Sequence, residues 1–164
     1  MAKDALKDIE VTRACGDCNL CCKIPSVDNP VGFKPDMYSW CTHCDIGVGC
    51  KIYDRRPDPC KEFICHWLRG IIPEELKPNK VGFYITQVHE NFFQDKVFSV
   101  YAEPFALKDI TKHLDKINLI DTQGNLWRYV IRYNANKNEV AVYDKVNFGN
   151  KLKFYNLNTD KTIK

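Results

Sequence analysis

The 164-residue sequence lacks the long apolar runs of a membrane protein and the leader pattern of an exported one. No stretch approaches the about 18 consecutive apolar residues that a spanning helix needs, so we expect no contact with a membrane. Residues 1–18 contain no basic segment followed by an apolar run. We therefore expect no export signal and a cytoplasmic protein.

The sequence also lacks a large excess of either positive or negative charge. Lys and Arg number 24 and Asp and Glu number 21, and this net charge of +3 does not indicate a polyanionic partner. A nucleic-acid partner is further disfavoured because a solvated sheet face is the commoner role for basic side chains such as those of Arg128, Arg132, Lys145, Lys151 and Lys153. Phosphate loops, nucleophile elbows, H-E-x-x-H and paired-carboxylate motifs are absent, so the sequence predicts no catalytic residue.

Cysteine is absent from His66 to Lys164, yet all nine cysteines of the chain lie between Cys15 and Cys65. In an exported chain such a density would indicate disulfides. The cytoplasm keeps thiols reduced, and an odd number of cysteines cannot pair completely. Metal ligation is the better explanation.

The cysteines form two clusters with metal-ligand spacing. The first is C-x2-C-x2-C-C, and the second begins with a C-x2-C pair; the nine candidate ligands are Cys15, Cys18, Cys21, Cys22, Cys41, Cys44, Cys50, Cys60 and Cys65. Two C-x2-C pairs are typical of tetrahedral zinc, whereas C-x2-C-x2-C with a remote cysteine is typical of a cubic 4Fe-4S cluster. Both an iron-sulfur cluster and Zn²⁺ stay open.

The adjacent cysteines suggest more than one centre. If residues 15–22 were helical, Cys15, Cys18 and Cys22 would fall within about 60° of one another, and Cys21 would point about 100° away from Cys22. Cys21 and Cys22 would then serve different metals, or one of them would only be packed. In a loop this angular argument would not apply, although adjacent side chains would still diverge.

Other side chains near the cysteines have ordinary roles as well as metal-related ones. His43 and His66 are more often hydrogen-bonded to a carbonyl than bound to zinc at such positions. Basic side chains can offset thiolate charge, and aromatic ones can pack the segment and shield sulfur from water; these are Lys51, Arg55, Arg56 and Lys61, and Trp40, Tyr53, Phe63 and Trp67.

The motifs C-x2-C-x2-C-C and C-x-I-Y-x-x-R-P-x-x-C-x-x-F-x-C-x-W, over about residues 13–80, resemble the CxxCxxCC family of zinc- or iron-chelating cysteine-cluster domains. The resemblance implies metal binding by Cys15, Cys18, Cys21, Cys22, Cys50, Cys60 and Cys65, and leaves Cys41 and Cys44 less certain. The related flagellin lysine methylases carry a similar pattern associated with an iron-sulfur cluster. This sequence lacks a G-x-G loop for a methyl-donor nucleotide, so methyl transfer does not follow.

The rest of the chain predicts an α+β fold. Residues 13–70 form an irregular Cys-rich metal module, and 81–164 form an antiparallel β-sheet with one covering helix, packed together as one compact unit. The predicted strands are 81–88, 97–103, 126–134 and 139–146, with 151–157 at an edge. Leu107, Ile110, Leu114 and Ile117 predict the helix, which begins after Pro104 and ends near Gly124.

We therefore expect a metal-binding protein with a redox role or a role as accessory to a modifying enzyme. The alternative is a zinc-stabilised interaction or nucleic-acid-binding module without catalytic activity. The sequence identifies no protein partner.

Overall fold

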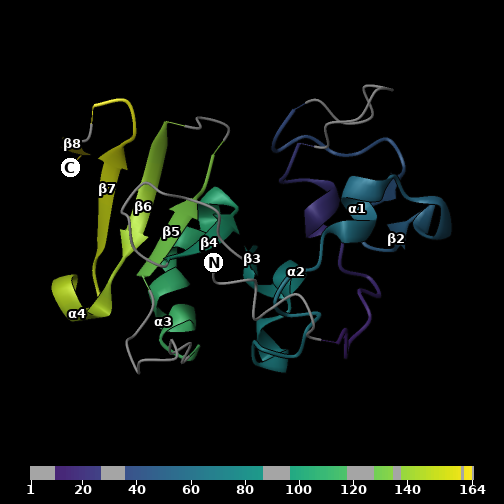
Figure 1. Cartoon of the computed structure of the whole chain (residues 1–164), viewed down its shortest axis with the longest axis horizontal. Coiled ribbons are helices and arrows are strands. Elements are labelled where there is room, and N and C mark those ends of the chain that lie inside the picture. Colours follow the sequence, from purple (N-terminus) through teal and green to yellow (C-terminus); the bar gives the residue numbers. More distant parts are fainter. Residues whose placement is uncertain are drawn as a thin grey trace, which may run out of the picture.

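The computed structural model describes residues 10–26, 36–86, 97–117, 128–134, 138–159 and 161–163. These residues form a mixed α+β fold. The described part of residues 13–70, called the cysteine segment below, lies beyond one edge of a β-sheet (Figure 1). In the described parts of the chain, every helix is too short or too polar to cross a bilayer.

The cysteine segment contains only short elements, as its many prolines and glycines predict. A two-stranded hairpin pairs Cys44 with Cys50. The elements up to the sheet are η1 (Leu20–Cys22), β1 (Cys44–Asp45), β2 (Gly49–Cys50), η2 (Tyr53–Arg55), α1 (Asp58–Glu62), η3 (Glu74–Leu76) and α2 (Pro78–Val81). Because residues 15–18 form a turn and only Leu20–Cys22 is a 3₁₀ helix, the angular argument from a continuous helix does not apply.

The main sheet has six strands in the order β3-β4-β5-β6-β7-β8. Its strands are β3 (Phe83–Thr86), β4 (Val97–Ala102), β5 (Arg128–Arg132), β6 (Glu139–Tyr143), β7 (Leu152–Asn156) and β8 (Lys161–Ile163). The helical elements between them are η5 (Pro104–Lys108), α3 (Ile110–Leu114) and α4 (Lys145–Phe148). The predicted helix end near Gly124 and the turn before residue 97 lie outside the described residues.

The prediction of a purely antiparallel sheet is wrong at one position. β4 and β5 run parallel, whereas every other neighbouring pair is antiparallel. Parallel neighbours need a long crossover, and the segment that contains α3 supplies it. The sequence pattern identifies the residues of β4 and β5 as strands. It does not predict their relative direction, because a connection that contains a helix can lead to either a parallel or an antiparallel strand.

Two further predictions about the sheet need correction. The strand predicted at residues 151–157 is not at the edge, because β8 pairs with β7 along its outer side. The covering helix is also interrupted: Asp109 has φ −120° and ψ 3°, which separates η5 from α3. The Asp109 carboxylate accepts a hydrogen bond from Lys112, 2.8 Å away.

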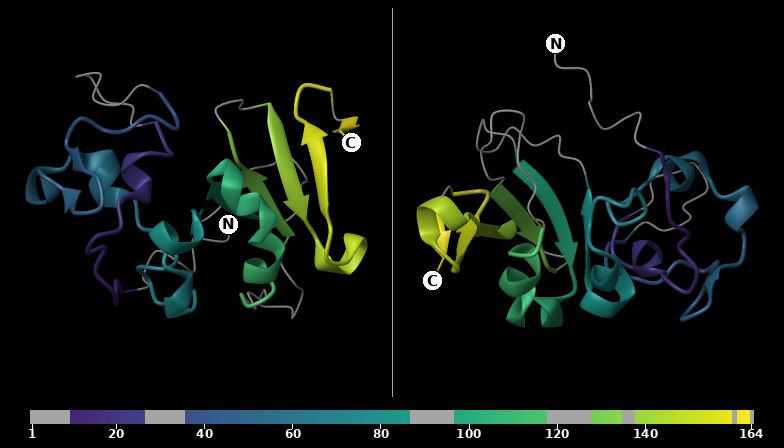
Figure 2. Two further views of the ribbon diagram at one scale, coloured as in Figure 1. Left: turned by 180° about the vertical axis from the view of Figure 1, so that it is seen from behind. Right: turned by 90° about the horizontal axis from the view of Figure 1, so that it is seen from below.

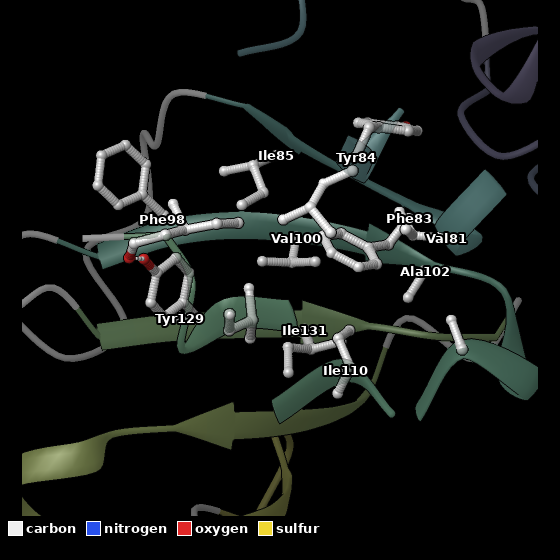
Figure 3. Packing of buried hydrophobic residues seen from close by; sticks show 14 of the residues in the cluster. Val81, Phe83, Tyr84, Ile85, Phe98, Val100, Ala102, Ile110, Tyr129 and Ile131 are labelled. Carbon is white, nitrogen blue, oxygen red and sulfur yellow. Dashed lines mark hydrogen bonds between the residues drawn. The ribbon is translucent and has the colours of Figure 1, made fainter. Parts of the chain in front are cut away.

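The apolar core runs through both the cysteine segment and the sheet. Ile110 of α3 packs against one face of the sheet, beside Val100 and Ile131 (Figure 3), and Leu114 of α3 belongs to the same buried cluster. The same buried cluster contains residues of the cysteine segment and of the stretch between it and β3, namely Leu20, Ile24, Cys65, Trp67, Ile72 and Leu76. Two views place this segment next to β3 (Figure 2). The cysteine segment thus shares its core with the sheet instead of building one alone.

Polar contacts complete the junction between the cysteine segment and the sheet. The His66 N–H donates to the Ile85 carbonyl at 2.9 Å, which uses part of the outer edge of β3. Lys23 pairs with Glu103 at 2.6 Å. The Tyr38 hydroxyl lies 3.0 Å from the Ala102 carbonyl oxygen and 3.1 Å from that of Arg132.

We expect Tyr38→Phe to lower the free energy of unfolding by about 1 kcal/mol, because it removes a partly buried hydrogen bond between the cysteine segment and the sheet. Urea denaturation of the wild type and the variant measures the change. Tyr133→Phe, a half-buried tyrosine just after β5, is the matched control and should change stability less. Equal effects of the two substitutions would contradict the role given to Tyr38.

Candidate metal centre

Seven of the nine cysteines line one cavity of about 450 Å³. They come from separate segments of the chain: Cys15, Cys18, Cys21, Cys22, Cys41, Cys50 and Cys60. A second, smaller cavity of about 40 Å³ is lined by Cys15, Cys18, Cys21, Cys60 and Cys65. Cys44 faces neither cavity, but its thiol is hydrogen-bonded to that of Cys22. Folding therefore gathers the cysteines of both sequence clusters.

Backbone hydrogen bonds hold these segments around the cavity. The Cys41 N–H donates to the Cys22 carbonyl at 2.9 Å, and the Cys44 N–H donates to the Cys41 carbonyl at 3.0 Å. Cys60 is carried by α1. At Gly49, φ is +146°, and an added Cβ would lie 3.4 Å from the Gly16 carbonyl oxygen. The hairpin is thus in ordinary contact with the turn that carries Cys15, and it is the positive φ that favours glycine at this position.

Three of the thiols accept a backbone hydrogen bond from the residue two positions later. The donors are the N–H groups of Leu20 to Cys18, His43 to Cys41 and Trp67 to Cys65. A second N–H group also reaches Cys18 and Cys65, from Asn79 and Leu68 respectively. Hydrogen bonds to sulfur favour the anionic form of a cysteine. The turns are thus arranged to stabilise thiolates.

Burial favours the neutral thiol and therefore opposes the effect of these hydrogen bonds. It raises the pKa of Cys44 to about 12 and that of Cys65 to about 11. Burial also raises the pKa values of Cys15, Cys18 and Cys60. These thiols are protonated at neutral pH in the metal-free protein, so a metal that binds them would release protons.

The thiols also act on one another electrostatically. After burial, Cys22, Cys41 and Cys50 raise the pKa of both Cys44 and Cys60. Cys18 raises the pKa of Cys15 and that of Cys65, and Cys22 raises that of Cys15 as well. The adjacent Cys21 and Cys22 both line the larger cavity, and Cys21 lines the smaller one too. That Cys21 and Cys22 serve different metals stays a prediction.

The thiols surround the cavity without forming a preformed single-ion site. Within the described ranges, no group of three or more Cys, His, Asp or Glu side chains is arranged to hold a metal ion. A tetrahedral zinc site needs four ligands at about 2.0 to 2.3 Å from the ion, and the described residues do not present such a set. The donor set still fits a thiophilic metal, because the cavity lining contains seven cysteines and no His, Asp or Glu.

Of the four basic residues predicted to offset thiolate charge, only Arg56 lines the cavities. Its charge lowers the pKa values of Cys15 and Cys60 against the larger effect of burial. Lys77, which the sequence analysis missed, acts in the same way on Cys18 and forms an ion pair with Asp17. No sequence signal identified Lys77, because it follows the last cysteine and only folding brings it close.

The aromatic residues are divided between the cavity and the core. Tyr53 and Phe63 line the larger cavity, and Trp67 lines the smaller one. Trp40 lines neither cavity and is 38% exposed. Tyr84 of β3 also lines the smaller cavity. The sequence analysis missed Tyr84 because its strand has the composition of an ordinary core strand.

The two histidines beside cysteines do not line the cavities. His66 is buried with its ring 5.3 Å from that of Phe98, and neither ring nitrogen has a hydrogen-bond partner among the described residues. Burial lowers the pKa of His66 to about 4, with the charge of Arg69 as a smaller cause. His43 contacts the cysteines through its backbone N–H, which donates to the Cys41 sulfur at 3.4 Å. The structure thus gives neither imidazole a place in the thiol-lined cavities.

No family model, curated protein or solved structure matches the chain.

We expect the metal-free protein to lose stability as pH rises from about 9 to 11. The pKa of Cys65 rises from 9.0 in an unfolded chain to about 11 when buried. The stability that this thiol contributes is complete below pH 9 and is lost as pH rises through 11, because the unfolded state ionises first. The loss from Cys65 alone is about 2 kcal/mol by pH 11.

Chemical denaturation of the metal-free protein at several pH values measures this effect. Cys65→Ala should flatten the pH dependence, whereas Leu68→Ala, a nearby apolar truncation, should retain the wild-type slope. A wild-type slope in Cys65→Ala would show that this thiol is not held protonated by burial.

Proposed function

We propose that this chain is a metal-binding protein that ligates an iron-sulfur cluster or zinc through its cysteines. The observation that carries the proposal is the single cavity lined by seven cysteines from separate segments. A buried free cysteine is ordinary as a small apolar residue, but seven around one cavity are not. None of the nine cysteines, all of which lie in the described residues, is part of a disulfide, as metal ligation in the reducing cytoplasm would require.

The width of the cavity favours an occupant with several metal ions. A volume of about 450 Å³ is large for one ion within bonding distance of four sulfurs. An iron-sulfur cluster contains its own bridging sulfides and therefore spans more widely placed thiolates. Several zinc ions that share bridging thiolates would also occupy such a space. We place the iron-sulfur cluster first and zinc second.

Charge limits how many thiolates a centre can use at once. Four thiolates leave a net charge of about −2 on an oxidised 4Fe-4S cluster or on a single zinc ion, whereas two zinc ions in eight thiolates would leave about −4. The cations that act on the thiols are Arg56 and Lys77, and Lys77 is already paired with Asp17. Backbone N–H groups at Cys18, Cys41 and Cys65 add partial positive charge. This amount of positive charge can offset a net charge of about −2 better than one of about −4.

The resemblance of residues 13–80 to the CxxCxxCC family supports metal binding by the same residues. It covers Cys15, Cys18, Cys21, Cys22, Cys50, Cys60 and Cys65, and the structure adds Cys41 to the cavity lining. A redox role, or support of a modifying enzyme, would follow from an iron-sulfur centre.

The second candidate is a zinc-stabilised interaction module. Exposed apolar side chains beside the cavity favour it: Ile46 and Val48, at the turn of the β1–β2 hairpin, are 61% and 67% exposed. Exposed apolar residues of this kind are common at protein interfaces. In this candidate the metal is structural and all its coordination positions are filled.

Purification under strict exclusion of oxygen, followed by elemental analysis, separates these functions. Iron and acid-labile sulfide with visible charge-transfer absorption would support the iron-sulfur centre. A colourless protein with stoichiometric zinc would support the interaction module. If neither metal is found, even after reconstitution with ferrous iron and sulfide or with zinc, the proposal is wrong.

We expect Cys18→Ser and Cys60→Ser to lower metal content by at least half and to destabilise the cysteine segment more than the sheet, since ligation there is coupled to folding. Elemental analysis gives the metal content, and hydrogen exchange compares the two regions. His43→Asn is the control: its side chain lies outside the cavity lining, so metal content should not change. Full metal content in both serine variants would contradict the ligand assignment.

A further inference from the structure

The hydroxyl group of Tyr84 is buried without a hydrogen-bond partner among the described residues. Tyr84 is 2% exposed and belongs to β3, the strand beside the cysteine segment. An unpaired buried hydroxyl costs about 1 to 3 kcal/mol, so native proteins seldom contain one without a reason. The common reasons are an ordered water or a bound group.

The surroundings of Tyr84 point to the thiol-lined cavity. Its side chain lies on the opposite side of β3 from Phe83 and Ile85, away from the core that α3 covers (Figure 3). It lines the smaller cavity together with Cys15, Cys18, Cys21, Cys60 and Cys65. Cys21 and Cys65 are close enough to act on it electrostatically. Five of the twelve residues that line the cavity beside Tyr84 are therefore cysteines.

Two aromatic rings fix the position of Tyr84. Phe63 meets it edge to face at 5.3 Å with an interplanar angle of 83°. Tyr101, its register partner on β4, stacks on it at 5.3 Å and 16°. A ring held on both sides cannot easily turn its hydroxyl toward another acceptor. The hydroxyl is thus preorganised toward the cavity.

Tyr84 can serve there only as a neutral donor. Burial raises its pKa well above the ordinary range, and the neighbouring Tyr101, Cys21, Tyr38 and Cys65 raise it further. A phenol that keeps its proton can donate to a sulfur anion.

We propose that the Tyr84 hydroxyl donates a hydrogen bond to sulfur of the metal centre, either a metal-bound thiolate of Cys21 or Cys65 or a bridging sulfide. This inference rests on the proposed metal-binding function and makes Tyr84 a positioning residue that links the sheet edge to the site. Outer hydrogen bonds to ligands commonly tune metal affinity and the properties of a cluster.

Tyr84→Phe tests the proposal because the effect should depend on the metal. In the loaded protein the variant should release metal to a chelator about tenfold faster, as expected for loss of a hydrogen bond to a charged group. In the metal-free protein the thermal midpoint should stay unchanged or rise, since the substitution removes an unpaired buried hydroxyl. If iron is bound, the charge-transfer absorption should also shift.

Tyr129→Phe is the matched control. The Tyr129 hydroxyl is buried and donates to the Ile117 carbonyl at 3.1 Å, in the part of the core that α3 covers. Its loss should lower the midpoint equally in loaded and metal-free protein and leave the release rate unchanged. This comparison separates a metal-dependent bond from general destabilisation of the sheet.

The outcomes separate this inference from the proposed function. If the wild type holds metal and Tyr84→Phe releases it at the wild-type rate, the inference is overturned and the proposed function stands. A midpoint lowered equally in both forms would overturn it as well, since an ordered water would then be the partner of the hydroxyl. A wild type that binds neither iron nor zinc overturns both proposals.

Discussion

The arrangement of the nine cysteine side chains depends on the junction between the cysteine segment and the β3 edge of the sheet. Small irregular segments cannot bury enough apolar surface to fold alone. Here Leu20, Ile24 and Trp67 enter the same core as the sheet. Hydrogen bonds across the junction, such as that from the His66 N–H to the Ile85 carbonyl, then hold the turns around the cavity.

Two opposing effects act on the pKa values of the thiols around the cavity. Without metal, burial keeps thiols such as Cys44 and Cys65 protonated, and the cavity wall is nearly apolar. With metal, the backbone N–H groups at Cys18, Cys41 and Cys65 would stabilise thiolates, as would Arg56. In the part of the chain that the structure describes, the thiols do not form a preformed site for one metal ion. The thiols are gathered, while metal binding would set the final positions of the sulfurs.

The sheet contributes more than support. β3 presents Phe83 and Ile85 to the core covered by α3, and Tyr84 to the cysteine segment, because alternate residues of a strand face opposite sides. The cysteine segment supplies Phe63 against the Tyr84 ring. This contact couples the packing of the sheet edge to the shape of the smaller cavity, and it explains why the two parts share one core.

The sequence by itself determined the α+β class, the strand and helix segments and the concentration of thiols, since these depend on local periodicity, composition and spacing. Tertiary structure alone decided which thiols face one cavity, the parallel pairing of β4 with β5 and the outer position of β8. It also placed Lys77 and Tyr84 beside the cysteines and His66 in the core. These features depend on contacts between residues distant in the chain, and local propensity contains no information about such contacts.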